Sequence, residues 1–146
     1  MDKKILVVNG PNLNMLGIRE PEKYGKTSLN EIVEKLTLKF NSLGYKIIHF
    51  QSNHEGEIID FIQKEGHKAS GLVINAGAYT HTSIAIRDAI LSVSIPCVEV
   101  HLSNIFKRED FRKISYISDI ALGVISGFGA YVYELGVLAL INYIGT

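Results

Sequence analysis

The sequence is poor in cysteine, net charge and long apolar runs, and each shortage excludes a class of protein. Cys97 is the only cysteine among 146 residues, so no internal disulfide can form, and a reducing, cytoplasmic location is expected. Lysine plus arginine number 15, as do aspartate plus glutamate, which gives a formal net charge of zero. A neutral chain without a basic run lacks an electrostatic footprint for nucleic acid or an anionic membrane. Low net charge does not oppose self-association, so the chain is free to form an oligomer.

The apolar runs predict neither a signal peptide nor a membrane span. The first run, residues 5–8, is shorter than the apolar centre of a signal peptide. Residues 120–144 are more apolar, but Ser126, Gly127, Gly129 and Glu134 interrupt them. This segment is therefore expected to form a buried strand, a glycine turn and a core helix.

Short apolar runs alternate with amphipathic stretches along the chain. The runs predict strands at residues 4–9, 46–50, 71–75, 97–100 and 121–125, and the stretches predict helices near 29–40, 58–66, 84–91 and 130–144. Apolar strands separated by helices indicate a parallel sheet covered on both faces. We therefore expect one α/β domain over residues 1–146, a flavodoxin-like, doubly wound, five-stranded parallel sheet in a three-layer α/β/α arrangement.

This architecture predicts where a ligand binds. In open α/β sheets the ligand lies beyond the carboxyl ends of the strands, where the strand order switches. The polar residues that end the predicted strands are Asn9, Gln51, Asn75 and the stretch 99–101. A ligand site is therefore expected at these residues and the loops that follow them.

The first such loop, around residues 10–26, is long for a connection in this fold and is typical of an active-site lid. It contains Asn12, Arg19 and Tyr24. A free tyrosine has a pKa near 10 and is a poor base at pH 7, but a nearby guanidinium favours its ionised form. The alternative is an ordinary surface loop with solvated charges.

The second loop begins with Asn75 and contains Gly77 and His81. Glycine permits close approach of the backbone to a ligand, and Thr82 or Ser83 can cap the next helix. The side chains of Asn75 and His81 suit hydrogen bonds to sugar-like hydroxyls. Alternatively, His81 merely belongs to a polar turn.

The third group is Glu99 and His101. They lie two positions apart along a predicted strand, so their side chains are expected to point to the same face. A carboxylate beside an imidazole fixes its tautomer and prepares a general acid. Two alternatives stay open: a metal site formed with His81, and a structural pair at a subunit interface.

The backbone amides of Leu102 and Ser103, with the guanidinium groups of Arg108 and Arg112, can receive a substrate carboxylate.

Other conspicuous residues have plainer interpretations. The sequence Gly127-Phe128-Gly129 lacks the full dinucleotide fingerprint, which favours a tight turn over a phosphate site. Gly136, inside the last predicted helix, indicates close packing of that helix. Cys97 is expected in the core. His49, His54 and His67 have no obvious partners in the sequence.

Several separated motifs together resemble type II 3-dehydroquinate dehydratases over essentially the whole chain. They are residues 9–17, Arg19 with Tyr24-Gly25, and residues 52–56, 75–81, 99–104 and 108–112. The resemblance implies elimination of water from 3-dehydroquinate, anti and through an enolate, to give 3-dehydroshikimate in the shikimate pathway of aromatic amino acid biosynthesis. It implies no cofactor and no metal.

The resemblance also implies a role for each site residue. Tyr24 would be the proton acceptor, Arg19 the group that stabilises the tyrosinate and the transition state, and His101 the proton donor, oriented by Glu99. Asn12 would hold a water against the developing enolate oxygen. The remaining positions would bind substrate: Asn75, His81, Asp88, Leu102, Ser103 and Arg112.

The resemblance further implies a homododecamer, a tetramer of trimers, in which Asp88 reaches the site of a neighbouring subunit. The runner-up is a non-catalytic flavodoxin-like module that binds flavin or receives phosphate. Pro11, which has no amide hydrogen, and Asn75, where a phosphoreceiver needs an acidic acceptor, count against it. A scaffold without activity is disfavoured by the presence of Arg19, Tyr24 and His101.

Overall fold

The protein is built on a twisted parallel sheet, seen in a computed structural model that describes residues 3–18, 22 and 26–145. The order of the strands across the sheet is β2-β1-β3-β4-β5, and every neighbouring pair is parallel. This is the flavodoxin-like order that the sequence predicts. The strands are β1 (Lys3–Asn9), β2 (Tyr45–Gln51), β3 (Gly71–Asn75), β4 (Cys97–His101) and β5 (Gly123–Ser126).

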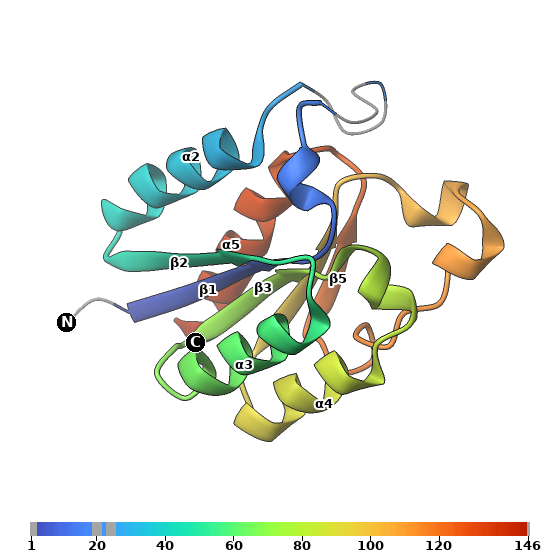
Figure 1. Cartoon of the computed structure of the whole chain (residues 1–146). Helices are drawn as coiled ribbons and strands as arrows, with labels where there is room; N and C mark the ends of the chain where they lie inside the picture. The colour runs from blue at the N-terminus through green and yellow to red at the C-terminus, as the bar shows by residue number, and fades with distance from the viewer. Residues whose placement is uncertain (1–2, 19–21, 23–25, 146) are drawn as a thin grey trace.

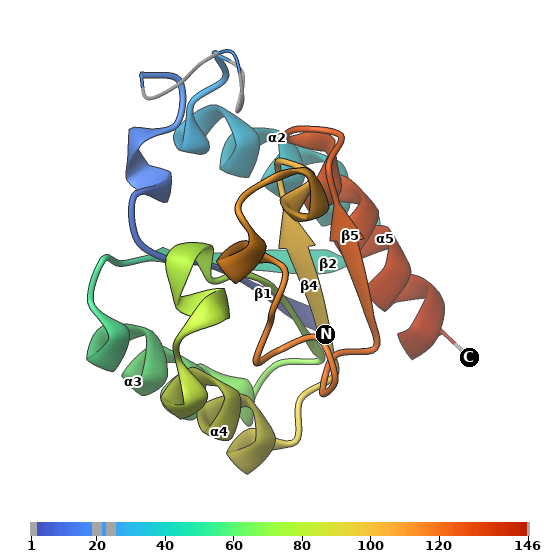
Figure 2. The ribbon, with the colours of Figure 1, turned by 90° about the vertical axis from the view of Figure 1, so that its right-hand side faces the viewer.

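Helices cover both faces of the sheet, as Figures 1 and 2 show. The pair α2 (Leu29–Asn41) and α5 (Tyr131–Ile144) covers one face, and the pair α3 (Glu55–Gly66) and α4 (Ile84–Val93) covers the other. Short 3-10 helices follow the strand ends: η1 (Leu13–Met15), η2 (Gly77–His81), η3 (Ile105–Lys107) and η4 (Asp110–Arg112).

Alternation along β1 explains why both faces of the sheet are buried. Ile5 and Val7 pack toward α2 and α5, whereas Leu6 and Val8 pack toward α3 and α4. All four side chains are fully buried. A parallel strand that is covered on both faces therefore has a continuous run of apolar residues, which is the pattern that the sequence shows.

Serine side chains cap two of the helices, and the cap at Ser83 is one of the two that the sequence offers for its helix. The Ser28 and Ser83 hydroxyls accept from the amides of Glu31 and Ile86 at the starts of α2 and α4. Two other boundaries differ from the sequence prediction. Helix α3 begins at Glu55 instead of 58, because its polar first turn carries acidic residues that suit a helix N-terminus. Strand β5 begins at Gly123, because Ile120 and Ala121 still belong to a turn on the Ile117 carbonyl.

The first and third strands end in loops that touch backbone to backbone. The Gly10 amide donates to the Asn75 carbonyl at 2.8 Å, and a Cβ on Gly10 would lie 2.2 Å from the Ala76 carbonyl oxygen. Across the same contact, a Cβ on Gly77 (φ +60°) would lie 3.0 Å from the Pro11 carbonyl oxygen. Only glycine permits this approach, which places the two loops at one edge of the sheet.

The predicted close packing at Gly136 is confirmed. A Cβ at this position of α5 would lie 3.1 Å from methyl groups of Val73 and Val100, so the glycine brings the helix close to the sheet. Residues 123–144 form a strand, a turn and a helix, in line with the sequence prediction. Among the described residues, no helix is both long and apolar enough to cross a membrane.

We expect Gly10→Ala to lower the free energy of unfolding by about 2–3 kcal/mol, because the new methyl group would collide with a backbone carbonyl that cannot rotate away. Urea unfolding followed by circular dichroism measures the change. The control is Gly56→Ala in α3, where no heavy atom of the described residues beyond its neighbours lies within 4 Å of a new Cβ. This control should gain about 0.5 kcal/mol. A Gly10→Ala protein as stable as wild type would contradict the close contact of the loops.

Candidate active site

A pocket opens at the carboxyl ends of β1, β3 and β4, where residues of the short 3-10 helices help to line it. This is the sheet edge that the sequence predicts. The lining residues are Pro11, Asn12, Leu13, Met15, Leu16, Asn75, Gly77, Ala78, His81, His101, Leu102, Ser103, Ile105, Arg108 and Arg112.

The pocket brings together most of the predicted site residues, namely Asn12, Asn75, His81, His101, Leu102, Ser103 and Arg112. Glu99 lies fully buried against His101. Asp88 is exposed on α4 and is not among the described residues that line the pocket. Arg19 and Tyr24 lie outside the described residues.

The central pair of the site is His101 and Glu99, both on β4. The Nε2 atom of His101 donates to Oε2 of Glu99, which confirms that the two side chains point to one face of the strand. Glu99 is fully buried and the His101 side chain is 6% exposed. With Nε2 directed at the carboxylate, the ring has its tautomer and orientation set, and Nδ1 is the other position for proton transfer.

Two serines that the sequence did not single out hold the same carboxylate. Ser115 Oγ donates to both oxygens of Glu99, at 3.0 and 3.1 Å, and Ser118 Oγ donates to Oε1 at 2.6 Å. Ser115 Oγ also accepts from the amides of Ile117 and Ser118. The signal in the sequence was Glu99 itself, a lone carboxylate inside an apolar strand. A buried carboxylate needs several hydrogen-bond donors, so further donors were to be expected near it.

These donors decide the charge of Glu99. Burial favours the neutral acid and raises its pKa, but the hydrogen bond and attraction of His101, with the hydroxyls of Ser118 and Ser115, outweigh burial and lower the pKa. At neutral pH Glu99 is therefore a carboxylate, able to stabilise a positive charge on His101.

A second imidazole faces the first across the pocket. His81 Nδ1 donates to the Ile114 carbonyl at 2.7 Å, and its ring lies nearly parallel to that of His101, with centroids 6.5 Å apart. Burial is the main cause that lowers the pKa of His81, and repulsion from His101 and Arg112 adds to it against the opposing hydrogen bond to Ile114. The neutral ring presents Nε2 as an acceptor, which suits a substrate hydroxyl.

Asn12 is held in an unusual backbone conformation at the start of the first loop. Its φ of 70° is left-handed, and its amide donates to Asn53 Oδ1 at 3.0 Å. Asn53 is anchored in turn by Gln51 Nε2 at 3.3 Å and by Tyr79, whose hydroxyl donates to the Asn53 carbonyl at 2.7 Å. Asn53 therefore positions Asn12 from the end of the neighbouring strand, a role that sequence spacing did not reveal.

The turn at Gly127-Phe128-Gly129 supports the pocket wall. The amides of Gly127 and Gly129 donate to the carbonyls of His101 and Leu102, each at 3.0 Å. Both amides are therefore engaged in the fold, which supports the interpretation as a tight turn. The contact holds the backbone of residues 101–103 at the pocket.

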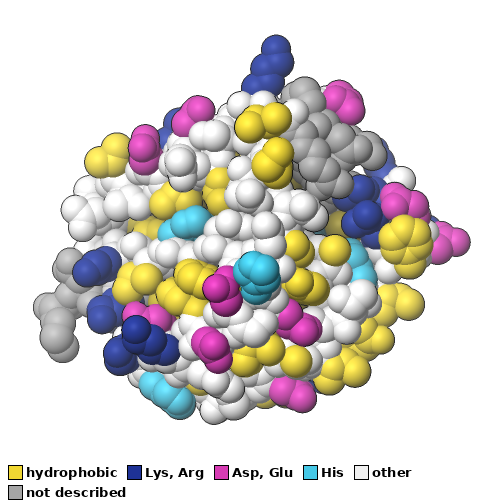
Figure 3. Space-filling view, in the orientation of Figure 1, with side chains coloured by type: hydrophobic (Ala, Val, Ile, Leu, Met, Phe, Trp, Pro, Cys, Tyr) yellow, Lys and Arg dark blue, Asp and Glu magenta, His cyan; other side chains and the backbone are white. Residues whose placement is uncertain are grey.

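Two guanidinium groups give the pocket positive charge. Arg108 and Arg112 both line it, and Arg112 Nε donates to Glu109 Oε2 at 2.9 Å. A guanidinium binds carboxylates well because its parallel N–H groups match two oxygens. Elsewhere, on the face drawn in Figure 3, basic and acidic side chains are interspersed.

The alternative of a metal site gains no support from the described part of the chain. There, no group of three or more His, Cys, Asp or Glu side chains is arranged to hold a metal ion. His81 Nδ1 and His101 Nε2 already bond to a carbonyl and a carboxylate.

Comparison with known proteins gives a consistent result. Residues 3–141 match the family model described as dehydroquinase class II. The chain is 56% identical to the 3-dehydroquinate dehydratase of Carboxydothermus hydrogenoformans, over 97% of this chain and 92% of that protein.

Solved structures agree. The type II dehydroquinase of Butyrivibrio crossotus superposes with a TM-score of 0.92 at 47% identity, over 95% of this chain and 97% of the other. For the type II dehydroquinase of Propionibacterium acnes the TM-score is 0.90 at 39% identity, over 100% and 99%.

We expect Ser115→Ala to lower the free energy of unfolding at pH 7 by about 1–3 kcal/mol, because a buried carboxylate loses a donor. The Glu99 pKa is depressed in the fold, so its contribution is present above the ordinary value of 4.5 and disappears as the pH falls through the folded pKa. The difference between wild type and variant should therefore narrow below about pH 4.5. Urea unfolding at several pH values measures it.

The matched control is Ser92→Ala, which removes an exposed hydroxyl that bonds only within α4 among the described contacts. Its stability should stay within about 0.5 kcal/mol of wild type at every pH. A constant difference for Ser115→Ala across the pH range would contradict the role of Ser115 toward the Glu99 carboxylate.

Proposed function

The chain belongs to the class II dehydroquinase family, and we propose that it removes water from 3-dehydroquinate, by anti elimination through an enolate, to give 3-dehydroshikimate. It is then a hydro-lyase of the shikimate pathway. The observation that carries the proposal is the buried His101–Glu99 pair, which faces a pocket lined by Asn12, Asn75 and Arg112.

The acid side of the reaction is assigned to His101. Loss of the substrate hydroxyl as water requires a proton, and a positioned imidazolium supplies one in general acid catalysis. Glu99 keeps the ring oriented through the hydrogen bond to Nε2, and Ser115 and Ser118 hold the carboxylate in place for that bond.

The base side is assigned to Tyr24, assisted by Arg19. The proton to be removed lies on the carbon beside the substrate ketone, and a tyrosinate is basic enough to accept it. A guanidinium favours the tyrosinate because opposite charges attract. Negative charge then develops on the ketone oxygen, where a water held by Asn12 would stabilise it.

Substrate binding is assigned to the remaining polar residues. Asn75 and His81 would bond to hydroxyl groups, and Arg112 with the backbone at Leu102 and Ser103 would receive the carboxylate. The segment 10–26 would act as a lid over the pocket, since Asn12 and Met15 within it already line the wall. No cofactor and no metal is assigned.

We also propose a homododecamer, a tetramer of trimers, formed by single-domain subunits in the cytoplasm. Asp88, exposed on α4, would reach the site of a neighbouring subunit. Support comes from the family and from the absence of net charge to oppose self-association.

We expect purified protein to convert 3-dehydroquinate to 3-dehydroshikimate without added metal, measured as a rise in ultraviolet absorbance because the product is a conjugated enone. Tyr24→Phe should lower kcat by about 10²–10⁴-fold while substrate still binds, because general base catalysis contributes about that much. The control is Tyr143→Phe, at the far end of α5, which should keep the wild-type rate.

No absorbance rise with folded wild-type protein would contradict the proposed function. A Tyr24→Phe rate near that of wild type would remove Tyr24 as the base. Borohydride with substrate should leave no covalent adduct, and a substrate-dependent adduct would indicate a Schiff base in place of this mechanism.

For the assembly, light scattering should give the mass of a dodecamer. Asp88→Ala should raise KM several-fold at unchanged mass, since a group from the neighbouring subunit is lost from the binding site. The matched control is Asp60→Ala, another exposed carboxylate on the same side of the sheet, which should leave KM unchanged. A monomeric active protein would contradict the assembly.

A further inference from the structure

A chain of hydrogen-bonded polar side chains, half-buried at its β2 end and buried beyond it, leads from β2 to the pocket. It consists of His49, Asn9, Tyr133 and Asn75. Asn9 Nδ2 bonds to His49 Nε2 at 3.0 Å, the Tyr133 hydroxyl donates to Asn9 Oδ1, and Asn75 Nδ2 donates to the Tyr133 hydroxyl at 3.0 Å. Asn9 and Tyr133 are fully buried and Asn75 is 3% exposed.

The Gly77 backbone amide determines which group donates and which accepts in each of these side-chain hydrogen bonds. The Gly77 amide donates to Asn75 Oδ1 at 3.2 Å, so Asn75 Nδ2 must face the phenol. The phenol oxygen then accepts from Asn75, and its hydrogen goes to Asn9 Oδ1. Asn9 is left with Nδ2 facing His49, whose Nε2 must accept. Each group therefore has only one orientation that satisfies its neighbours.

The neutral state that this direction requires of His49 agrees with its surroundings. An imidazolium has no acceptor nitrogen, so a protonated His49 would face the Asn9 amide donor with another donor. Burial lowers the pKa of His49, which keeps the ring neutral at physiological pH.

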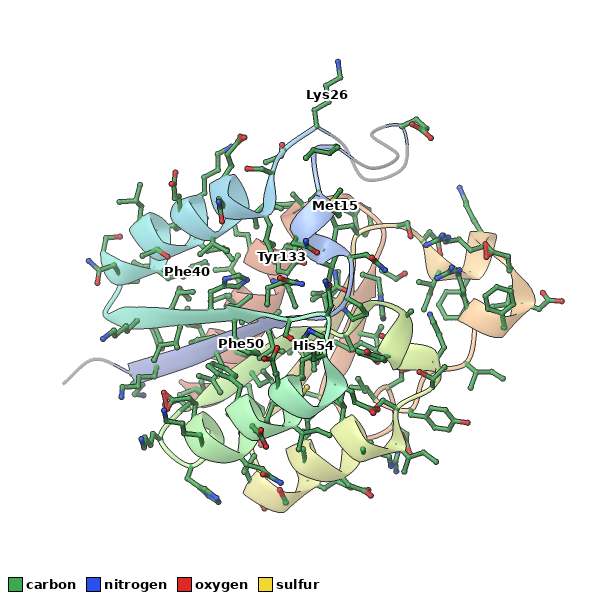
Figure 4. All side chains as sticks on the ribbon, in the orientation of Figure 1. Met15, Lys26, Phe40, Phe50, His54 and Tyr133 are labelled. Atoms are coloured by element: carbon green, nitrogen blue, oxygen red, sulfur yellow. The ribbon has the colours of Figure 1, made fainter. Side chains whose placement is uncertain are left out.

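Tyr133 reaches the sheet because α5 approaches it closely. Gly136, one turn further along the helix, presses against Val73 and Val100, so the helix axis lies near the strands. Figure 4 shows Tyr133 close to the centre of the molecule. Its hydroxyl is thereby placed between Asn9 and Asn75, the last residues of β1 and β3.

We propose that Tyr133 is a positioning residue for substrate binding, which acts together with the Gly77 amide to hold the side-chain amide of Asn75 in one orientation. An asparagine amide has nearly the same shape after a half-turn, so sterics alone do not hold it. The phenol takes one Nδ2 hydrogen and leaves the second for the pocket that Asn75 lines. The inference rests on the proposed function, in which Asn75 binds substrate.

The test is steady-state kinetics of Tyr133→Phe with 3-dehydroquinate. Loss of the hydroxyl leaves the Asn75 amide held by the Gly77 amide alone, so its orientation is less firmly fixed. We therefore expect KM to rise about tenfold with kcat changed less than about threefold, because the weakened interaction binds the substrate equally in the ground state and the transition state. In an Asn75→Ala background the same substitution should change KM less than about twofold, because its effect passes through Asn75. The matched control is Tyr131→Phe, a phenol on the same helix that is 53% exposed, which should leave both constants unchanged.

An unchanged KM for Tyr133→Phe would overturn the inference. So would an equal rise in KM in the wild-type and Asn75→Ala backgrounds, because that result indicates a general structural effect.

A measurement on wild-type protein tests the inference even if the variant fails to fold or the enzyme is inactive. In protein labelled with ¹⁵N-asparagine, one Asn75 side-chain amide hydrogen should exchange slowly and give a nuclear Overhauser effect to the Tyr133 ring. Fast exchange without that effect would overturn the inference. Inactive wild type with the slow hydrogen would instead overturn the proposed function and leave the Asn75–Tyr133 lock established.

Discussion

The structure depends on keeping one carboxylate ionised inside its core. Glu99 is fully buried on the interior strand β4 between apolar neighbours, and burial by itself favours the neutral acid. A charge in that position is tolerable only when its oxygens are satisfied by hydrogen bonds and an opposite charge. His101 supplies one partner from the same strand, and Ser115 and Ser118 supply the others from the chain after η4. The segment that carries Ser115 and Ser118 therefore helps to hold Glu99, and through Glu99 the ring of His101, in place at the pocket.

The need of buried polar groups for hydrogen-bond partners also explains where polar side chains occur in the core. The buried residues of the strands are mostly apolar, and the buried polar side chains of the described residues gather toward the carboxyl edge of the sheet. They are Asn9, Ser52, Asn75, Thr80, Ser83, Glu99 and His101. Each lies at the end of a strand, within β4, or in the loop that follows β2 or β3. Parallel strands bring these ends to one edge, so groups far apart in sequence can meet there.

Much of this was predictable from local patterns. Five apolar runs separated by helical patterns predicted the parallel sheet, and the polar residues that end the runs predicted the edge that holds the pocket. Glu99 and His101 were paired by strand parity alone, and the structure confirms their contact. Motifs spread over the chain indicated the family, which comparison with known proteins confirms. Boundaries at α3 and β5 were less accurate, because turns and first-turn charges do not follow apolar periodicity.

Other parts of the site had no local signal. Ser115 and Ser118 look like ordinary loop serines, Asn53 like a surface amide, and Tyr133 like one more aromatic residue in a core helix. Their importance comes from partners that lie 16 to 124 positions away, which no spacing rule connects. By itself, the sequence determined which residues form strands and helices and which edge of the sheet is polar, because periodicity and burial act over a few residues. Only the tertiary structure decided which donor satisfies which buried acceptor, because a hydrogen bond forms at about 3 Å between groups that folding brings together.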